Sequence, residues 1–99
     1  MYSDHIELDE DLALDLIQQA DKYSVPDLKK LCEQFLPVHL SPDNYVKLAN
    51  LAELLDATLL REAAVTYIAK NVRELKERQD FQDISDNILR DVILKITGQ

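Results

Sequence analysis

Hydrophobic residues recur at three- and four-residue spacing along most of this chain, as on the buried face of an amphipathic helix. The periodicity predicts five helices, with approximate bounds at residues 11–22, 24–36, 42–55, 56–68 and 86–96. The fourth pattern runs on far enough to carry that helix through Val72 and Leu75. Residues 2–8 alternate weakly and fit a short extended N-terminal segment. One Gly and three Pro leave few sites for tight β-turns, so the sequence predicts an all-α fold.

Polar residues and prolines mark the expected helix starts. Ser24 precedes the second pattern, with Asp27 at the capping-box position. Ser41, followed by Pro42, precedes the third, and Asp56 precedes the fourth. These residues are therefore predicted to be the N-caps of their helices.

The chain also contains an internal repeat. A shift of 32 residues superimposes the first two helical patterns on the next two. The matched pairs include Leu16 and Leu48, Ala20 and Ala52, Ser24 and Asp56, Leu28 and Leu60, Cys32 and Ala64, and Phe35 and Tyr67. Each unit reads as a helical hairpin, and stacked hairpins bury a shared core while leaving grooves for peptides. We expect one compact five-helix bundle, made of two stacked helical hairpins and a C-terminal helix.

Charge is unevenly distributed. The chain carries a net charge of −8, and residues 1–27 hold eight acidic residues against Lys22 alone. This balance argues against binding nucleic acid or an anionic membrane surface, both of which require basic residues. Cys32 is the only cysteine, so no intrachain disulfide can form, and no apolar run suggests a signal sequence or membrane span. We expect a cytoplasmic or nuclear protein.

Nothing in the sequence supports catalysis. His5 and His39 are the only histidines, and neither forms a recognisable catalytic grouping. Cys32 falls on the apolar stripe of its helix, where a structural thiol is expected. There is no phosphate-binding glycine loop and no metal-ligand spacing. We therefore predict no catalytic, cofactor-binding or metal-binding residues and no small-molecule substrate.

The segment Ala20–Glu33 resembles the helix–turn–helix late in the BTB (POZ) domain of substrate adaptors for cullin-RING ubiquitin ligases. Residues 2–8 resemble the segment before the last two BTB helices. The series Leu40-Ser41-Pro42-Asp43-Asn44 and the apolar positions of 51–68 resemble the 3-box and the opening of the BACK region in speckle-type POZ and Kelch-like adaptors. The resemblance divides the chain into BTB-like C-terminal helices over 1–39 and 3-box/BACK-like helices over 40–99.

The resemblance implies a non-catalytic module that helps bring a substrate to a cullin-3 RING ubiquitin ligase. In that family, the 3-box helix pair and the end of the BTB domain form a hydrophobic cleft for the N-terminal extension of cullin-3. Carried over by position, the cleft residues are Phe35, Leu36, Leu40, Asn44, Tyr45, Leu48 and Leu51. Asn44 has the alternative role of a cap or turn residue, and any of the apolar residues could instead close the core.

The sequence departs from the family pattern, because it lacks the first half of a BTB domain and a MATH, Kelch or ankyrin module. Apolar surface that the missing half would cover is expected to form an interface, with Ile6, Leu12 or Leu14 in it. A homodimer, through this surface or through the last helix, is one such outcome. The alternative function is a generic helical-repeat scaffold, for protein binding or homo-oligomerisation, unrelated to cullin.

Overall fold

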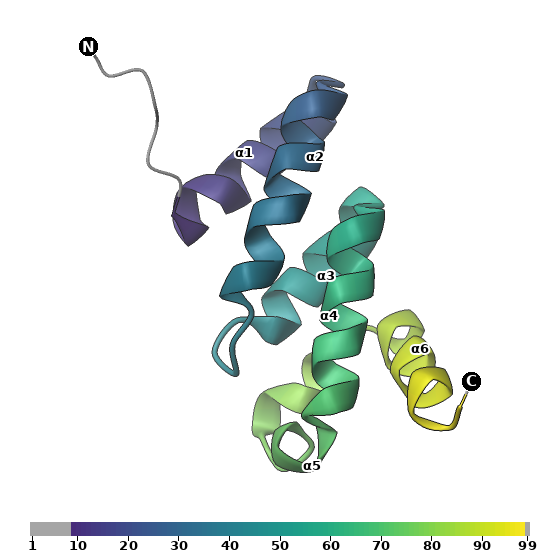
Figure 1. The fold of residues 1–99 in the computed structure, drawn as a ribbon. Coiled ribbons are helices and arrows are strands. Elements are labelled where there is room, and N and C mark those ends of the chain that lie inside the picture. Colours follow the sequence, from purple (N-terminus) through teal and green to yellow (C-terminus); the bar gives the residue numbers. More distant parts are fainter. Residues whose placement is uncertain (1–8, 99) are drawn as a thin grey trace.

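The computed structural model describes residues 9–98, and in this part of the chain all regular secondary structure is helical, with no strand (Figure 1). The α-helices are α1 (Glu10–Lys22), α2 (Pro26–Phe35), α3 (Tyr45–Leu55), α4 (Thr58–Lys70), α5 (Val72–Leu75) and α6 (Asp86–Ile96), with 3₁₀ turns η1 (Leu36–His39) and η2 (Gln79–Asp83). The all-α prediction is confirmed. The extended segment expected over 2–8 lies outside the described residues.

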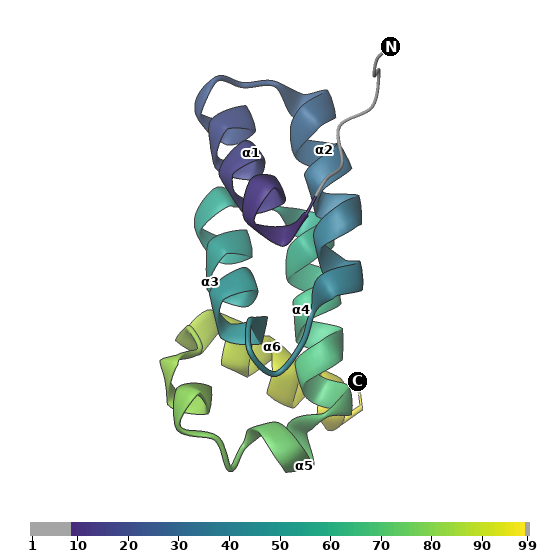
Figure 2. The same cartoon turned by 90° about the vertical axis from the view of Figure 1, so that its left-hand side faces the viewer.

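Two helical hairpins, α1/α2 and α3/α4, pack against each other with a stagger along their length, and α6 packs across α4 (Figure 2). The result is elongated, with extents of 49 × 23 × 22 Å. One apolar core joins the hairpins: Ala13, Leu14, Ile17, Cys32, Leu36, Leu48, Ala52, Ala57 and Leu60. A second core lies under α6: Tyr45, Ala49, Ala64, Val65, Ile68, Leu75, Ile84, Ile88 and Val92. Helices α3 and α4 contribute to both cores.

The internal repeat is visible in the two hairpin turns. Ser24 and Asp56 both adopt left-handed backbone conformations, with φ of 57° and 56°. The turns close with the same main-chain hydrogen bond, from Val25 N–H to Ala20 O and from Ala57 N–H to Ala52 O, each 2.8 Å. This is the Schellman ending, in which the residue after the C-cap turns left-handed.

The prediction that Ser24 and Asp56 cap the following helices is wrong. An N-cap residue usually has an extended backbone, whereas both residues have the positive φ that ends the preceding helix. The N-cap positions fall one residue later, on Val25 and Ala57, and neither side chain can cap. At the first helix, by contrast, the Asp9 carboxylate accepts a hydrogen bond from the Leu12 N–H at 2.8 Å.

The third helix begins later than predicted, at Tyr45 rather than next to Pro42. The Ser41 Oγ accepts from the Asp43 N–H at 3.3 Å, which makes a local turn instead of a helix cap. Asn44 occupies the N-cap position, and its side chain ties the turn together. Its Oδ1 accepts from the Ser41 N–H and its Nδ2 donates to the His39 carbonyl, both at 2.8 Å. Asn44 thus makes the hydrogen bonds of a turn residue.

Two charged side chains of α2 reach from the first hairpin to the second. The Glu33 Oε1 accepts a 2.8 Å hydrogen bond from the Leu59 N–H, in the first turn of α4. The Lys29 Nζ donates to the Leu55 carbonyl at 2.7 Å, at the end of α3. A cation thus meets the C-terminus of one helix and a carboxylate the N-terminus of the next, as the helix dipoles favour.

Candidate partner-binding grooves

The residues predicted for one cleft occupy different environments. Leu36, Tyr45 and Leu48 are fully buried, and Asn44 is 6% exposed. The partly buried ones are Phe35, Leu40 and Leu51. In this packing the fully buried side chains present no surface to a partner.

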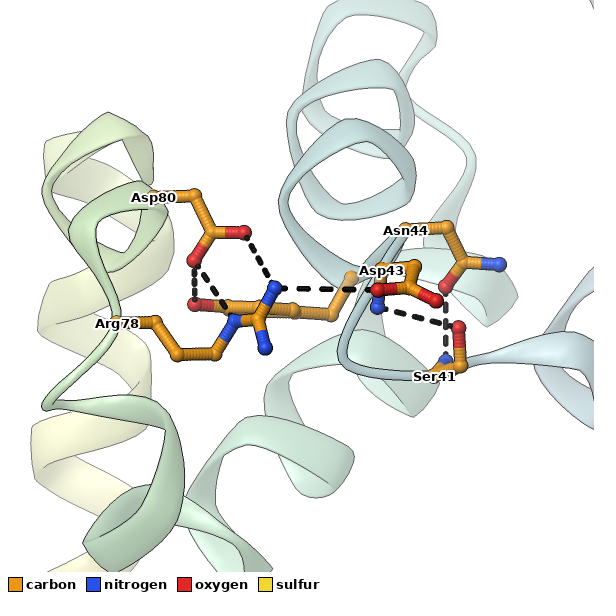
Figure 3. A network of polar contacts seen from close by, with 6 residues as sticks. Ser41, Asp43, Asn44, Arg78 and Asp80 are labelled. Carbon is orange, nitrogen blue, oxygen red and sulfur yellow. Dashed lines mark hydrogen bonds and ion pairs between the residues drawn. The ribbon is translucent and has the colours of Figure 1, made fainter.

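A polar network of Asp43, Arg78 and Asp80 lies beside the start of α3 (Figure 3). Tyr45 is hydrogen-bonded to this network. Its hydroxyl donates a 2.8 Å hydrogen bond to Asp80 Oδ1, and the Arg78 guanidinium pairs with the same carboxylate at 3.2 Å. Arg78 also lies 3.9 Å from the Asp43 carboxylate. Burial, followed by the bonded carboxylate, raises the pKa of Tyr45 to about 12. The bonds from Arg78 and then Tyr45 lower the pKa of Asp80. This network fastens η2 to α3.

A hollow of about 580 Å³ lies between α1 and α3. Leu14, Leu51 and Leu54 supply its apolar lining. Its polar lining comes from Asp11, Asp15 and Gln18 on α1 and from Lys47 and Asn50 on α3. We call it the α1/α3 groove. Leu54 is 78% exposed, so this groove offers an apolar side chain to a partner.

A second hollow of about 490 Å³ lies between η1 and α4. Pro37, Leu40, Leu59, Ala63 and Tyr67 line it, together with Thr66 and the charged residues Glu62, Lys70 and Lys95. Leu40 and Leu51, predicted to share one cleft, therefore line different hollows.

Helix α6 leaves an apolar strip uncovered. Ile93 and Leu94 are more than half exposed, and they line a shallow hollow of about 300 Å³ with Leu89. Ile88 and Val92, on the opposite side of the helix, are buried in the second core. The helix is thus apolar on two sides, and one of them faces outward.

Sequence reasoning missed Leu54 as a groove residue, and it expected Leu14 in an interface but not in the cleft. Leu14 is only 6% exposed and has the spacing of a core residue. Leu54 carried a usable signal, because it widens the apolar surface of α3 beyond the stripe that the core needs. Of the expected interface residues, Leu14 lines the groove, Leu12 is partly buried, and Ile6 lies outside the described residues.

Metal ligands, a reactive thiol and a membrane-spanning helix were each sought among the described residues. Within residues 9–98 no group of three His, Cys, Asp or Glu side chains could hold a metal ion. Cys32 is fully buried, and burial raises the pKa of its thiol, so the thiolate needed for nucleophilic attack is disfavoured. No helix in the same range is long and apolar enough to cross a bilayer.

Comparison with known proteins finds a family match in the first part of the chain. Residues 1–40, which include α1 and α2, match the BTB/POZ domain. This is a family of protein-interaction domains, generally without catalytic activity. Relatives align across most of the chain, so the similarity continues beyond residue 40 into the second hairpin.

A BTB/POZ domain-containing protein of Arabidopsis thaliana is 34% identical over 84 residues, which cover 85% of this chain and 35% of that protein. The protein maternal effect lethal 26 of Caenorhabditis elegans is 32% identical over 92 residues, 90% of this chain and 23% of the relative. Human gigaxonin is 28% identical over 93 residues, 94% of this chain and 16% of gigaxonin. The chain thus spans about a third or less of these relatives. No solved structure matches significantly.

Proposed function

We propose that this chain is the non-catalytic, cullin-binding part of a BTB/BACK substrate adaptor for a cullin-3 RING ubiquitin ligase. The observation that carries the proposal is the α1/α3 groove. One wall comes from a helix of the BTB-matching segment and the other from the helical hairpin that follows it. In this proposal residues 40–99 are the 3-box and BACK opening, and the groove receives the N-terminal extension of cullin-3.

The lining of the groove indicates what it would bind. Its leucines favour a segment that presents apolar side chains along one face. Asp11 and Asp15 on the α1 wall are both exposed, so a basic residue at that edge of the segment would be attracted. Among the cleft residues, Leu51 would contact the segment directly, whereas Leu36, Tyr45 and Leu48 would support the helices from beneath.

The test is the affinity of the chain for the N-terminal domain of cullin-3, measured by calorimetry with Leu54→Ala. Burial of hydrocarbon contributes about 0.8 kcal/mol per CH₂, so truncating this leucine should remove about 1–2 kcal/mol of binding free energy. The Kd should rise roughly 5- to 30-fold. Tyr45 is a poor choice for this test because its substitution disturbs the core and the Asp80 bond.

Leu31→Ala is the matched control, because Leu31 is 52% exposed on α2 and does not line the groove. It should leave the Kd unchanged. Equal weakening by both variants would exclude the groove as the docking site. No binding by the wild-type chain would remove cullin-3 as the partner of this chain.

The second candidate function is a homo-oligomerisation or general protein-binding scaffold, and the exposed strip of α6 favours it. Ile93→Asp should then convert an oligomer to a monomer in sedimentation equilibrium. A wild-type chain that stays monomeric at high concentration would exclude homo-oligomerisation.

A further inference from the structure

We propose that Lys29 is a positioning residue that fixes the two walls of the α1/α3 groove relative to each other. Glu33 supports this role through a second hydrogen bond from α2 to the second hairpin. The effect of Lys29 on partner binding rests on the proposed function of the groove, whereas its effect on the orientation of α1 relative to α3 does not. Lys29 lies on α2, outside the groove lining, and acts on both walls through hydrogen bonds.

The walls need such a connection because they belong to different hairpins. Helix α1 packs chiefly against α2, and α3 chiefly against α4. Apolar contacts between the hairpins hold them together, but burial of apolar surface is non-directional. Directional contacts add to the constraint that side-chain packing places on the angle and spacing of the walls.

Lys29 provides a directional contact to each wall. Its Nζ donates to Asp21 Oδ1 on α1 at 2.9 Å and to the Leu55 carbonyl on α3 at 2.7 Å. Asp21 lies less than one turn beyond the groove residue Gln18, and Leu55 directly follows the groove residue Leu54. One ammonium group therefore joins both walls at the same end of the groove.

Two features make this connection firm. The Lys29 side chain is only 21% exposed, so its ionic hydrogen bonds are partly shielded from water. One turn further along α2, the carboxylate of Glu33, a residue only 8% exposed, receives the Leu59 N–H of α4. Lys29 and Glu33 thus hold both sides of the turn between α3 and α4, and α2 cannot slide along the second hairpin without breaking them.

The test is Lys29→Met, which keeps the aliphatic stem and removes both hydrogen bonds. Arg61→Met is the matched control, because Arg61 occupies the equivalent position of the repeat and pairs with Asp91 of α6, away from the groove. The first readout is the orientation of α1 relative to α3, from residual dipolar couplings of the free protein. The second is the Kd for the cullin-3 N-terminal domain.

We expect Lys29→Met to change the α1/α3 orientation and Arg61→Met to leave it as in the wild type. The Kd should rise roughly three- to tenfold for Lys29→Met, because binding would then have to fix the walls at a cost of about 1 kcal/mol, comparable to one net hydrogen bond. The effect of Leu54→Ala should shrink in the Lys29→Met background. A purely stabilising role would lower the melting temperature without altering the orientation.

An unchanged α1/α3 orientation in folded Lys29→Met overturns the inference, whatever the chain binds. A changed orientation in a protein whose wild type does not bind cullin-3 supports the inference and refutes the proposed function. If Lys29→Met does not fold, Asp21→Asn weakens only the α1 bond and should shift the orientation less, in the same direction. The wild-type orientation in Asp21→Asn would then overturn the inference.

Discussion

The buried hydroxyl of Tyr45 should make the stability of this protein sensitive to alkaline pH. Tyr45 is fully buried, its hydroxyl donates to Asp80, and its pKa is raised from 10 to about 12. Ionisation of the phenol is therefore easier in the unfolded chain than in the folded one. The resulting stability is fully present below pH 10 and is lost as pH rises from 10 through the folded pKa near 12.

The size of the effect follows from the shift. Each pKa unit corresponds to 1.36 kcal/mol, so two units give about 2–3 kcal/mol lost by pH 12. Tyr45→Phe removes the ionisable group and its hydrogen bond. At pH 7 this variant should be about 1 kcal/mol less stable than the wild type. The difference should shrink with rising pH and change sign before pH 12, because the variant has no phenol at this position to ionise.

The assay is urea unfolding followed by far-ultraviolet circular dichroism at several pH values between 7 and 11.5. Comparing two proteins isolates Tyr45, since the other alkaline groups titrate in both. Tyr23→Phe is the control, because it removes a hydroxyl from a residue that is 65% exposed, and it should track the wild type. A wild-type minus Tyr45→Phe difference that stays constant with pH would refute the reasoning.

Two further predictions concern a hairpin turn and the attachment of α6. Ser24→Gly should raise the free energy of unfolding by about 0.5–1 kcal/mol in urea denaturation, since Gly adopts the φ of 57° without strain; Ser24→Ala, which keeps the strain, should not stabilise. Glu53 accepts hydrogen bonds from Ser85 and Asn87, which lower its pKa. Its contribution is present above its ordinary pKa and is lost as pH falls through the lower folded value. Glu53→Gln should therefore make stability fall less steeply as the pH drops below the ordinary pKa of a glutamate, and an unchanged fall would contradict this.

The helices could be predicted from the sequence, but their turns were partly misread. Apolar spacing located α1 and α6 to within a residue or two. Ser24 and Asp56 were misassigned because Ser and Asp favour N-caps, while the turn required a left-handed residue at those positions. The repeat indicates that Ser24 and Asp56 share one conformation, since both residues occupy the same place in their hairpins.

Residue spacing alone does not predict the groove, because the groove depends on how separate elements pack. Leu51 was expected in a cleft only through the family resemblance. Leu14 and Leu51 have ordinary core spacing, and nothing local indicates that one side of each stays open. Lys29 and Glu33 are four residues apart on one helix, a spacing typical of an exposed ion pair. In the structure each instead reaches the second hairpin.

The sharing of α3 and α4 between the two cores has a consequence for cooperativity. Leu48 and Leu60 belong to the core between the hairpins, while Ala49 and Ala64 belong to the core under α6. Loss of either core would remove side-chain contacts from both α3 and α4. Local unfolding at one end of the molecule would therefore destabilise the core at the other end. The family match that ends at residue 40 therefore marks no boundary in folding, and unfolding should cross this position as a single transition.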